Sequence, residues 1–252
     1  MLLRVAPKVD ARYWAAILVA SMLGANLGDL LPDTFHLSTS ISLLVLVIAF
    51  VAIVVFDRRT EHGREAFYWV ALLVVRAAAT IVADFFVNRE GLGYLVVSLA
   101  ISFLLAILLL SQGDLQRPYD SDLPATNAFY WSTMLIAGSL GTVIGDGIGH
   151  AFGAVQIGVP LSALIATLVL YALLSARRHM RRASIAIYWI TIVVVRWWGT
   201  NTGDIGKFTL SIWASIAITS VALTLVLRFW PVQPTVRNDG RHNTRPTRGT
   251  PV

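Results

Sequence analysis

Four aspartates stand inside long apolar segments of this 252-residue chain, where a charge needs a physical reason. Each of them follows a Tyr-Trp dipeptide, sixteen residues after the tyrosine: Asp29, Asp84, Asp146 and Asp204. Amphipathic aromatic side chains prefer the membrane interface, and sixteen residues of α-helix then place each carboxylate about 24 Å across the bilayer. The spacing predicts four carboxylates at one depth, and an ionisable residue inside a membrane is by default a functional candidate.

Two arginines occupy the middle of the same segments. Arg76 and Arg196 come eight residues after their tyrosines, about 12 Å deep, where the other two segments have Ser21 and Gly138. An arginine near the bilayer centre is costly and normally faces a bundle interior or a wet cavity, where it pairs with another group. We therefore expect both guanidinium groups to face inward.

The partners of these arginines decide between two interpretations. In the first, arginines and aspartates form structural ion pairs that fix helix register. In the second they line a transport path, and the arginines pair across helices with Asp84 and Asp204 in one state of the cycle. Asp29 and Asp146 would then lack an arginine partner and face one another across a central axis, where they could bind a cation.

Further polar side chains accompany the aspartates: Asn26, Thr142 and Asn201 in the same segments, and Asp33, His36 and His150 just beyond them. His150 comes four residues after Asp146, on the same helical face if the helix continues. Asp29, Asp146, His36 and His150 form a candidate site for a divalent cation such as Mn²⁺ or Zn²⁺, or for a proton relay. A lone histidine at a membrane turn is more often a surface residue, and carboxylates with amides alone would suit Na⁺, Mg²⁺ or H⁺ equally well.

The composition places these charges within a bilayer. Hydrophobic residues make up 56% of the chain and charged residues 13%, against about 25% charged in soluble domains, and the mean hydropathy is +0.70. There is no cysteine, which excludes disulfides, thiolate metal sites and iron–sulfur clusters, and no cofactor is expected. The net charge of +6 would suggest nucleic acid for a soluble protein, but membrane topology explains it, so we expect no nucleic-acid partner.

The fourfold Tyr-Trp spacing also predicts the architecture, because seven tyrosines and eight tryptophans would form well under one such pair by chance. A second apolar run follows each aspartate, at 37–56, 92–111, 155–175 and 208–230. The sequence therefore predicts an all-α membrane protein of eight transmembrane helices in four parallel two-helix repeats, at 13–56, 68–111, 130–175 and 188–230. The alternation of the arginines makes these repeats two duplicated four-helix halves. A short segment, 1–12, precedes them, and a disordered basic tail, 231–252, follows.

Small residues four apart precede each aspartate, and they predict close helix contacts. The pairs are Gly24 and Gly28, Ala79 and Ala83, Gly141 and Gly145, and Gly199 and Gly203. Sixteen of the 20 lysines and arginines fall on the side that holds both termini and the linkers between repeats. The positive-inside rule then predicts cytoplasmic termini in a bacterial inner membrane, with a homo-oligomer possible through an outer small-residue face.

With these features the chain resembles a bacterial family of uncharacterised integral membrane proteins built from four tandem two-helix repeats. The resemblance covers Tyr13 to about Trp230. It lies in the Tyr-Trp pairs and in the Gly-Asp steps at 28–29, 145–146 and 203–204, with Ala83-Asp84 departing from the glycine. The family has no assigned activity, so the resemblance implies an architecture and no mechanism.

The residues favour a carrier for a small cation, with membrane aspartates lining its path. A channel is a close alternative, because four aspartates resemble a cation filter, but two arginines at mid-membrane would repel the same ions. A scaffold or sensor without a transported substrate would need the charges for packing alone. No nucleophile–base pair, zinc helix or cofactor loop is present, so an enzyme is not expected.

Overall fold

The computed structural model describes residue 3 and residues 5–60, 64–111, 118–119, 126–179 and 183–230. These residues form eight long helices: α1 (Ala11–Asp29), α2 (Thr39–Arg59), α3 (Glu65–Asp84), α4 (Tyr94–Ser111), α5 (Ala128–His150), α6 (Val155–His179), α7 (Ile185–Thr209) and α8 (Ile212–Phe229). Two strands of two residues each, β1 (Pro118–Tyr119) and β2 (Ala183–Ser184), form a short antiparallel pair that the sequence did not predict. The predicted tail, 231–252, lies outside the described residues.

Seven of the helical segments are long and apolar enough to cross a bilayer. The eighth long helix, α7, is not among these seven segments, and it carries three charged residues, Arg196, Asp204 and Lys207. Large apolar side chains on the outer helices are exposed, such as Leu95 at 73% and Phe229 at 74%. An apolar exterior of this kind fits a lipid environment, as the composition predicted.

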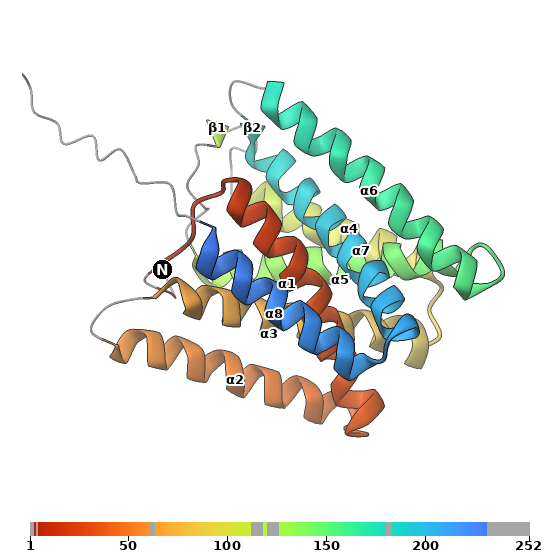
Figure 1. Ribbon diagram of the computed structural model, residues 1–252. Coiled ribbons are helices and arrows are strands. Elements are labelled where there is room, and N and C mark those ends of the chain that lie inside the picture. Colours follow the sequence, from red (N-terminus) through yellow and green to blue (C-terminus); the bar gives the residue numbers. More distant parts are fainter. Residues whose placement is uncertain are drawn as a thin grey trace, which may run out of the picture.

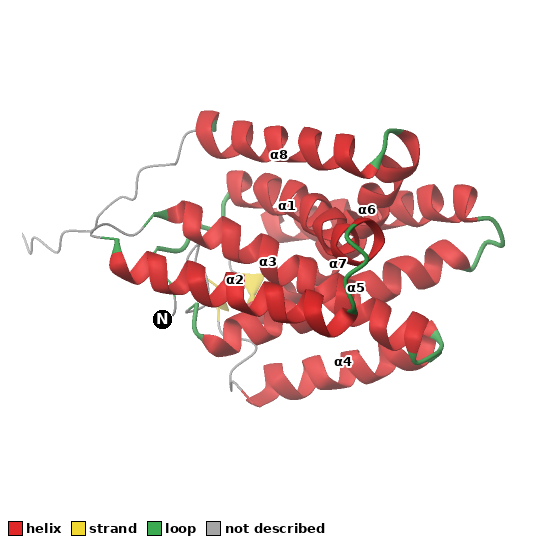
Figure 2. Ribbon diagram, turned by 90° about the horizontal axis from the view of Figure 1, so that it is seen from below, coloured by secondary structure: helices red, strands yellow, loops and turns green. Residues whose placement is uncertain are grey.

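The four helices that carry the Tyr-Trp pairs form a closed ring. Each of α1, α3, α5 and α7 packs against the next, and α7 packs against α1. The other four helices lie outside this ring: α2 against α3, α4 against α5, α6 against α7 and α8 against α1. Figure 1 shows α2 and α6 at opposite edges of the bundle, and the turned view in Figure 2 shows α8 and α4 at the other two edges. Each outer helix therefore packs against the inner helix that follows it in the chain, and the last outer helix, α8, packs against the first inner helix, α1.

Small residues allow the inner helices to approach closely, as predicted. A Cβ atom added to Gly141 would lie 2.5 Å from Cβ of Arg196 and 2.6 Å from the carbonyl oxygen of Val193. Gly24 meets Arg76 in the same way across the α1–α3 contact. The residue eleven positions after one tyrosine thus packs against the residue eight positions after the next.

The ends of the inner helices differ from one another. Asp10 and Asn127 accept hydrogen bonds from the backbone N–H groups of Tyr13 and Tyr130, so α1 and α5 begin two residues before the tyrosine. After Asp29 and Asp84 the chain winds into π-helical turns, 30–34 and 85–89, whereas α5 and α7 continue as α-helix past their aspartates. The predicted start of the last span at residue 208 is wrong, because α7 runs to Thr209.

Candidate functional site

The four tyrosines of the Tyr-Trp pairs point into the centre of the bundle and not outward from it. All four are at most 1% exposed. Their hydroxyls form a closed ring, with oxygen–oxygen distances of 2.8 Å for Tyr13–Tyr188, 2.7 Å for Tyr68–Tyr130, 3.3 Å for Tyr130–Tyr188 and 3.4 Å for Tyr13–Tyr68. Inward hydroxyls satisfy one another, so the ring closes one end of the central axis without leaving a buried polar group unpaired.

Every fourth residue after each tyrosine belongs to a further layer. The first of these is apolar and fully buried, and it consists of Ile17, Leu72, Met134 and Ile192. A row of every fourth residue is inclined by about 26° to its helix axis. Helices that keep such a row on a shared axis must cross one another at an angle, which the close glycine contacts permit.

The next layer holds the two arginines, each 1% exposed. Within the described part of the chain neither of them pairs with an aspartate, so the pairs with Asp84 and Asp204 that were predicted for one state of the cycle are not formed in this conformation. Nη2 of Arg196 lies 3.7 Å from Sδ of Met134, and its Nε and Nη1 have no partner among the described residues. Arg196 thus points back toward the apolar layer, away from the aspartates.

Arg76 is bound by hydroxyl groups instead. Its Nη1 donates to Oγ1 of Thr80 at 2.6 Å and of Thr142 at 3.0 Å, and its Nη2 donates to Oγ1 of Thr200 at 2.7 Å. These threonines come twelve residues after their tyrosines, where the first segment has Ala25. The guanidinium reaches only as far as this hydroxyl layer, one helical turn short of the aspartates, which explains why Arg76 and Asp84 are not paired in this conformation.

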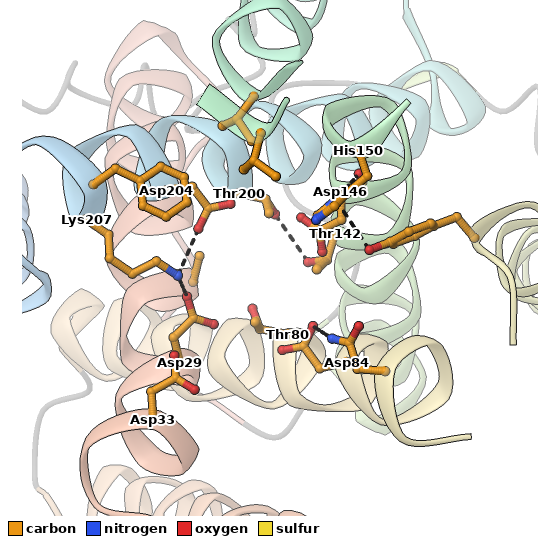
Figure 3. A pocket seen from close by; sticks show the side chains of 16 residues that line it. Asp29, Asp33, Thr80, Asp84, Thr142, Asp146, His150, Thr200, Asp204 and Lys207 are labelled. Carbon is orange, nitrogen blue, oxygen red and sulfur yellow. Dashed lines mark hydrogen bonds and ion pairs between the residues drawn. The ribbon is translucent and has the colours of Figure 1, made fainter. Parts of the chain in front are cut away.

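A cavity of about 280 Å³ opens above the threonine layer (Figure 3). The structure brings all four membrane aspartates to its wall, together with Asp33 and a single lysine, Lys207. Apolar and aromatic side chains complete the lining: Ala25, Tyr94, Val155, Val159 and Phe208. Five carboxylates against one lysine make the cavity electronegative, and a partly enclosed site strengthens such a field.

Lys207 divides the aspartates into two pairs. Its Nζ lies 2.6 Å from Oδ2 of Asp29 and 3.1 Å from Oδ1 of Asp204. The predicted absence of an arginine partner at Asp29 agrees with the described ion pairs, but a lysine that was not predicted there takes that place, because α7 continues as a helix past Asp204 and carries Lys207 into the cavity. Among the described residues, Asp84 accepts a single 3.4 Å hydrogen bond, from Asn88, and no lysine or arginine pairs with Asp84 or Asp146.

Only one of the two histidines of the candidate metal site lines the cavity. His150 lies at the cavity, where its ring stacks on Tyr94 with centroids 5.5 Å apart and its Nδ1 is 2.7 Å from the carbonyl oxygen of Asp146. His36 is exposed and does not line the cavity. Among the residues that the structure describes, no three His, Asp or Glu side chains gather closely enough to hold a metal ion.

The two candidate asparagines are fully buried but do not line the cavity. Asn26 donates to Oγ of Ser215 on α8 at 2.7 Å, and Asn201 donates to the carbonyl oxygen of Trp197 at 3.1 Å. The Asn26 bond joins α1 to α8, whereas the Asn201 bond lies within α7, so both residues support the wall of the site and do not face the cavity. Thr142, in contrast, lines the cavity as expected.

Several lining residues escaped the sequence analysis, namely Thr80, Thr200, Lys207, Tyr94 and Phe208. The signal for the two threonines was present, because position twelve after the tyrosine reads Ala, Thr, Thr, Thr. Position twenty reads Asp33, Asn88, His150 and Phe208, all of which line the cavity. A period of four followed from the tyrosine to position twenty would therefore have found Thr80, Thr200 and Phe208, but not Tyr94 or Lys207.

Long apolar helices surrounding one acidic cavity define this chain as a multi-pass membrane protein with a central polar pocket. Residues 12–62, a stretch that includes nearly all of α1 and the whole of α2, match a family described as a Repeat of Unknown Function (DUF347). This match supports the expected relationship to an uncharacterised repeat family for that segment. No curated protein and no solved structure matches the chain.

Proposed function

We propose that the protein is a membrane transporter for a small cation, and that the acidic cavity is its binding site. One observation carries the proposal: Asp84 and Asp146 lie in a cavity of about 280 Å³ and pair with no cation among the described residues. Carboxylates in a confined site attract a positive ligand strongly, because the surrounding low dielectric screens their charge less than water does.

The proposed topology has four parallel two-helix repeats, with both termini in the cytoplasm of a bacterial cell. It is supported by the shared course of the inner helices, each of which runs from the tyrosine ring to the aspartates. The lysine and arginine distribution then orients the tyrosine ring toward the cytoplasm. In this orientation the cavity opens to the outer side of the membrane.

The central axis is closed below the cavity, which favours a carrier over an open channel. Below the cavity the threonine layer, Arg76, Arg196 and the tyrosine ring follow one another, and two buried guanidinium groups would repel a passing cation. Transport therefore requires a second conformation that opens the tyrosine end while the cavity closes, as in alternating access.

The same closed axis favours one other function, a cation sensor that binds without transport. In a sensor the tyrosine ring would never open, and the ligand would alter the packing of the inner helices. Binding is common to both functions, so uptake separates them.

The experiment is a thermal unfolding series on the detergent-purified protein with H⁺, Na⁺, K⁺, Mg²⁺, Mn²⁺ and Zn²⁺, followed by uptake into proteoliposomes. A ligand specific to the folded state adds about 2.7 kcal/mol of stability at a hundredfold excess over its Kd. We expect stabilisation of the native protein and of the control Glu90→Gln, whose side chain is exposed and outside the cavity, but not of Asp84→Asn with Asp146→Asn.

Binding with uptake supports the transporter, and binding without uptake supports the sensor. If no cation, including the organic cation tested below, stabilises the native protein more than the double variant, the cavity is not a cation site and the proposal is wrong.

A further inference from the structure

The cavity already holds one cation, the ammonium group of Lys207. Asp29 and Asp204 accept its hydrogen bonds at 2.6 and 3.1 Å, and the Nζ atom lies 5.8 Å from the centre of the Phe208 ring. A primary ammonium on an alkyl chain is thus bound here by two carboxylates and an aromatic neighbour. The contacts show which chemistry the walls of this cavity accept.

The opposite half of the cavity offers the same kinds of group, and no described lysine or arginine pairs with them. Asp84 and Asp146 supply two carboxylates, and Figure 3 shows them across the cavity from Lys207. Tyr94, stacked on His150, supplies an aromatic face next to Asp146. Val155 and Val159 supply an aliphatic wall, which a bare ion does not need but an alkyl chain does.

The dimensions also suit an organic cation. A cavity of about 280 Å³ is several times the volume of about 30 Å³ that a water molecule takes in the liquid. Metal ions require several oxygen ligands converging at about 2.0 to 2.6 Å, whereas an ammonium group needs only hydrogen bonds of ordinary length. The carboxylates come from four different helices around the wall and alternate with apolar surface, an arrangement that suits a head group with a short chain.

We infer that the substrate is a small primary alkylammonium ion and that Lys207 is its built-in competitor for Asp29 and Asp204. This inference rests on the proposed function and names its substrate class. The substrate enters at Asp84 and Asp146, and displacement of the lysine ammonium lets it reach all four membrane carboxylates. Lys207 then returns to Asp29 and Asp204 when the substrate leaves, so the cavity is never without a counter-charge on that side.

The competition has a measurable size. A short tether holds the lysine ammonium at an effective concentration in the millimolar range or above. We take the lysine ammonium and a free alkylammonium ion to have the same intrinsic Kd for Asp29 and Asp204. If this Kd is about ten times lower than the effective concentration, the lysine weakens binding of the free ion about tenfold, and removal of the lysine charge reverses that loss. The gain should depend on the charge of residue 207 and not on its bulk.

The test measures binding of n-butylammonium chloride to the purified full-length protein by isothermal calorimetry, with NaCl and MgCl₂ at equal ionic strength as alternatives. Lys207→Met removes the charge and keeps much of the length. Lys207→Gln is a second neutral variant, in case the apolar side chain disturbs folding among the aspartates. Lys207→Arg is the matched control, because it keeps a positive charge.

We expect n-butylammonium to bind the native protein and Lys207→Arg similarly, both neutral variants about tenfold more tightly, and the Asp84→Asn with Asp146→Asn variant at least tenfold more weakly. If Na⁺ or Mg²⁺ binds at the aspartates and n-butylammonium does not, the substrate class is wrong while the cation site stands. If n-butylammonium binds the native and both neutral variants equally, the competitor role of Lys207 is wrong. If no cation binds any variant, the proposed function fails with it.

Discussion

The tyrosine ring gives the sharpest test of the axis, through the variant Tyr68→Phe. The substitution removes one hydroxyl oxygen and leaves the buried ring in place. Tyr130 then loses its short partner at 2.7 Å and keeps only the 3.3 Å contact to Tyr188, while Tyr13 loses its 3.4 Å contact and keeps Tyr188 at 2.8 Å. The damage falls almost wholly on Tyr130.

The cost follows from this geometry. A buried hydroxyl that loses its partner destabilises a protein by about 1–3 kcal/mol, and the lower half of that range applies because a weaker contact remains. Removing the partner as well, in Tyr68→Phe with Tyr130→Phe, deletes both members of one short pair and leaves the 2.8 Å pair intact. The double variant should therefore cost about 1 kcal/mol less than the sum of the two single variants.

The assay is equilibrium unfolding in mixed micelles, followed by tryptophan fluorescence. Tyr171→Phe is the control, because Tyr171 is 74% exposed on α6 and its loss should change stability by less than about 0.5 kcal/mol. If Tyr68→Phe behaves like this control, or if the double variant costs the full sum, the hydroxyls do not form the coupled ring described above.

Two further predictions concern the glycine contacts and the cavity. Gly141→Ala should lower the free energy of unfolding by about 2–3 kcal/mol, because the added methyl meets Arg196 and backbone atoms at 2.5–2.8 Å; in the same unfolding assay Gly93→Ala, with nothing within 4 Å, should cost under about 1 kcal/mol. Equal losses would contradict the close helix contact. Asp146→Asn should leave the stability of the cation-free protein unchanged or raise it, since it removes a like charge from the cavity, while stabilisation by added cation falls in a thermal series. A large loss of stability without cation would mean that Asp146 is structural.

The repeated spacing of residues in the sequence predicted much of the architecture. Apolar runs of about twenty residues predicted the long helices, because a bilayer requires spans of that length. The constant distance from tyrosine to aspartate predicted that four carboxylates would share one level, and the cavity contains all four. Gly141 and its counterparts predicted close packing for the same reason, since small residues four apart form a groove on one helix face.

The pairing of charges was not accessible in the same way. Opposite charges suggested that Arg76 would bind an aspartate, but the guanidinium donates a hydrogen bond to Thr80, one turn along the same helix. The predicted last span at 208–230 leaves Lys207 in the turn before it, whereas the continuation of α7 to Thr209 brings this side chain to Asp29 on α1. Contacts between residues this far apart in the chain depend on where each helix ends, and helix ends are the least defined feature of a sequence.

The closure of α8 and α7 onto α1 has a consequence for the order of synthesis. Three polar groups of α1 have close partners near the far end of the chain: Tyr13 at Tyr188, Asn26 at Ser215 and Asp29 at Lys207. A ribosome delivers α1 first and these partners last, so until α7 and α8 are inserted the amide of Asn26 and the carboxylate of Asp29 lack these partners, and the hydroxyl of Tyr13 has only the longer contact to Tyr68. Its insertion is therefore completed only when the final two helices arrive, and a chain truncated before α7 would expose a polar stripe to lipid that cellular quality control can recognise.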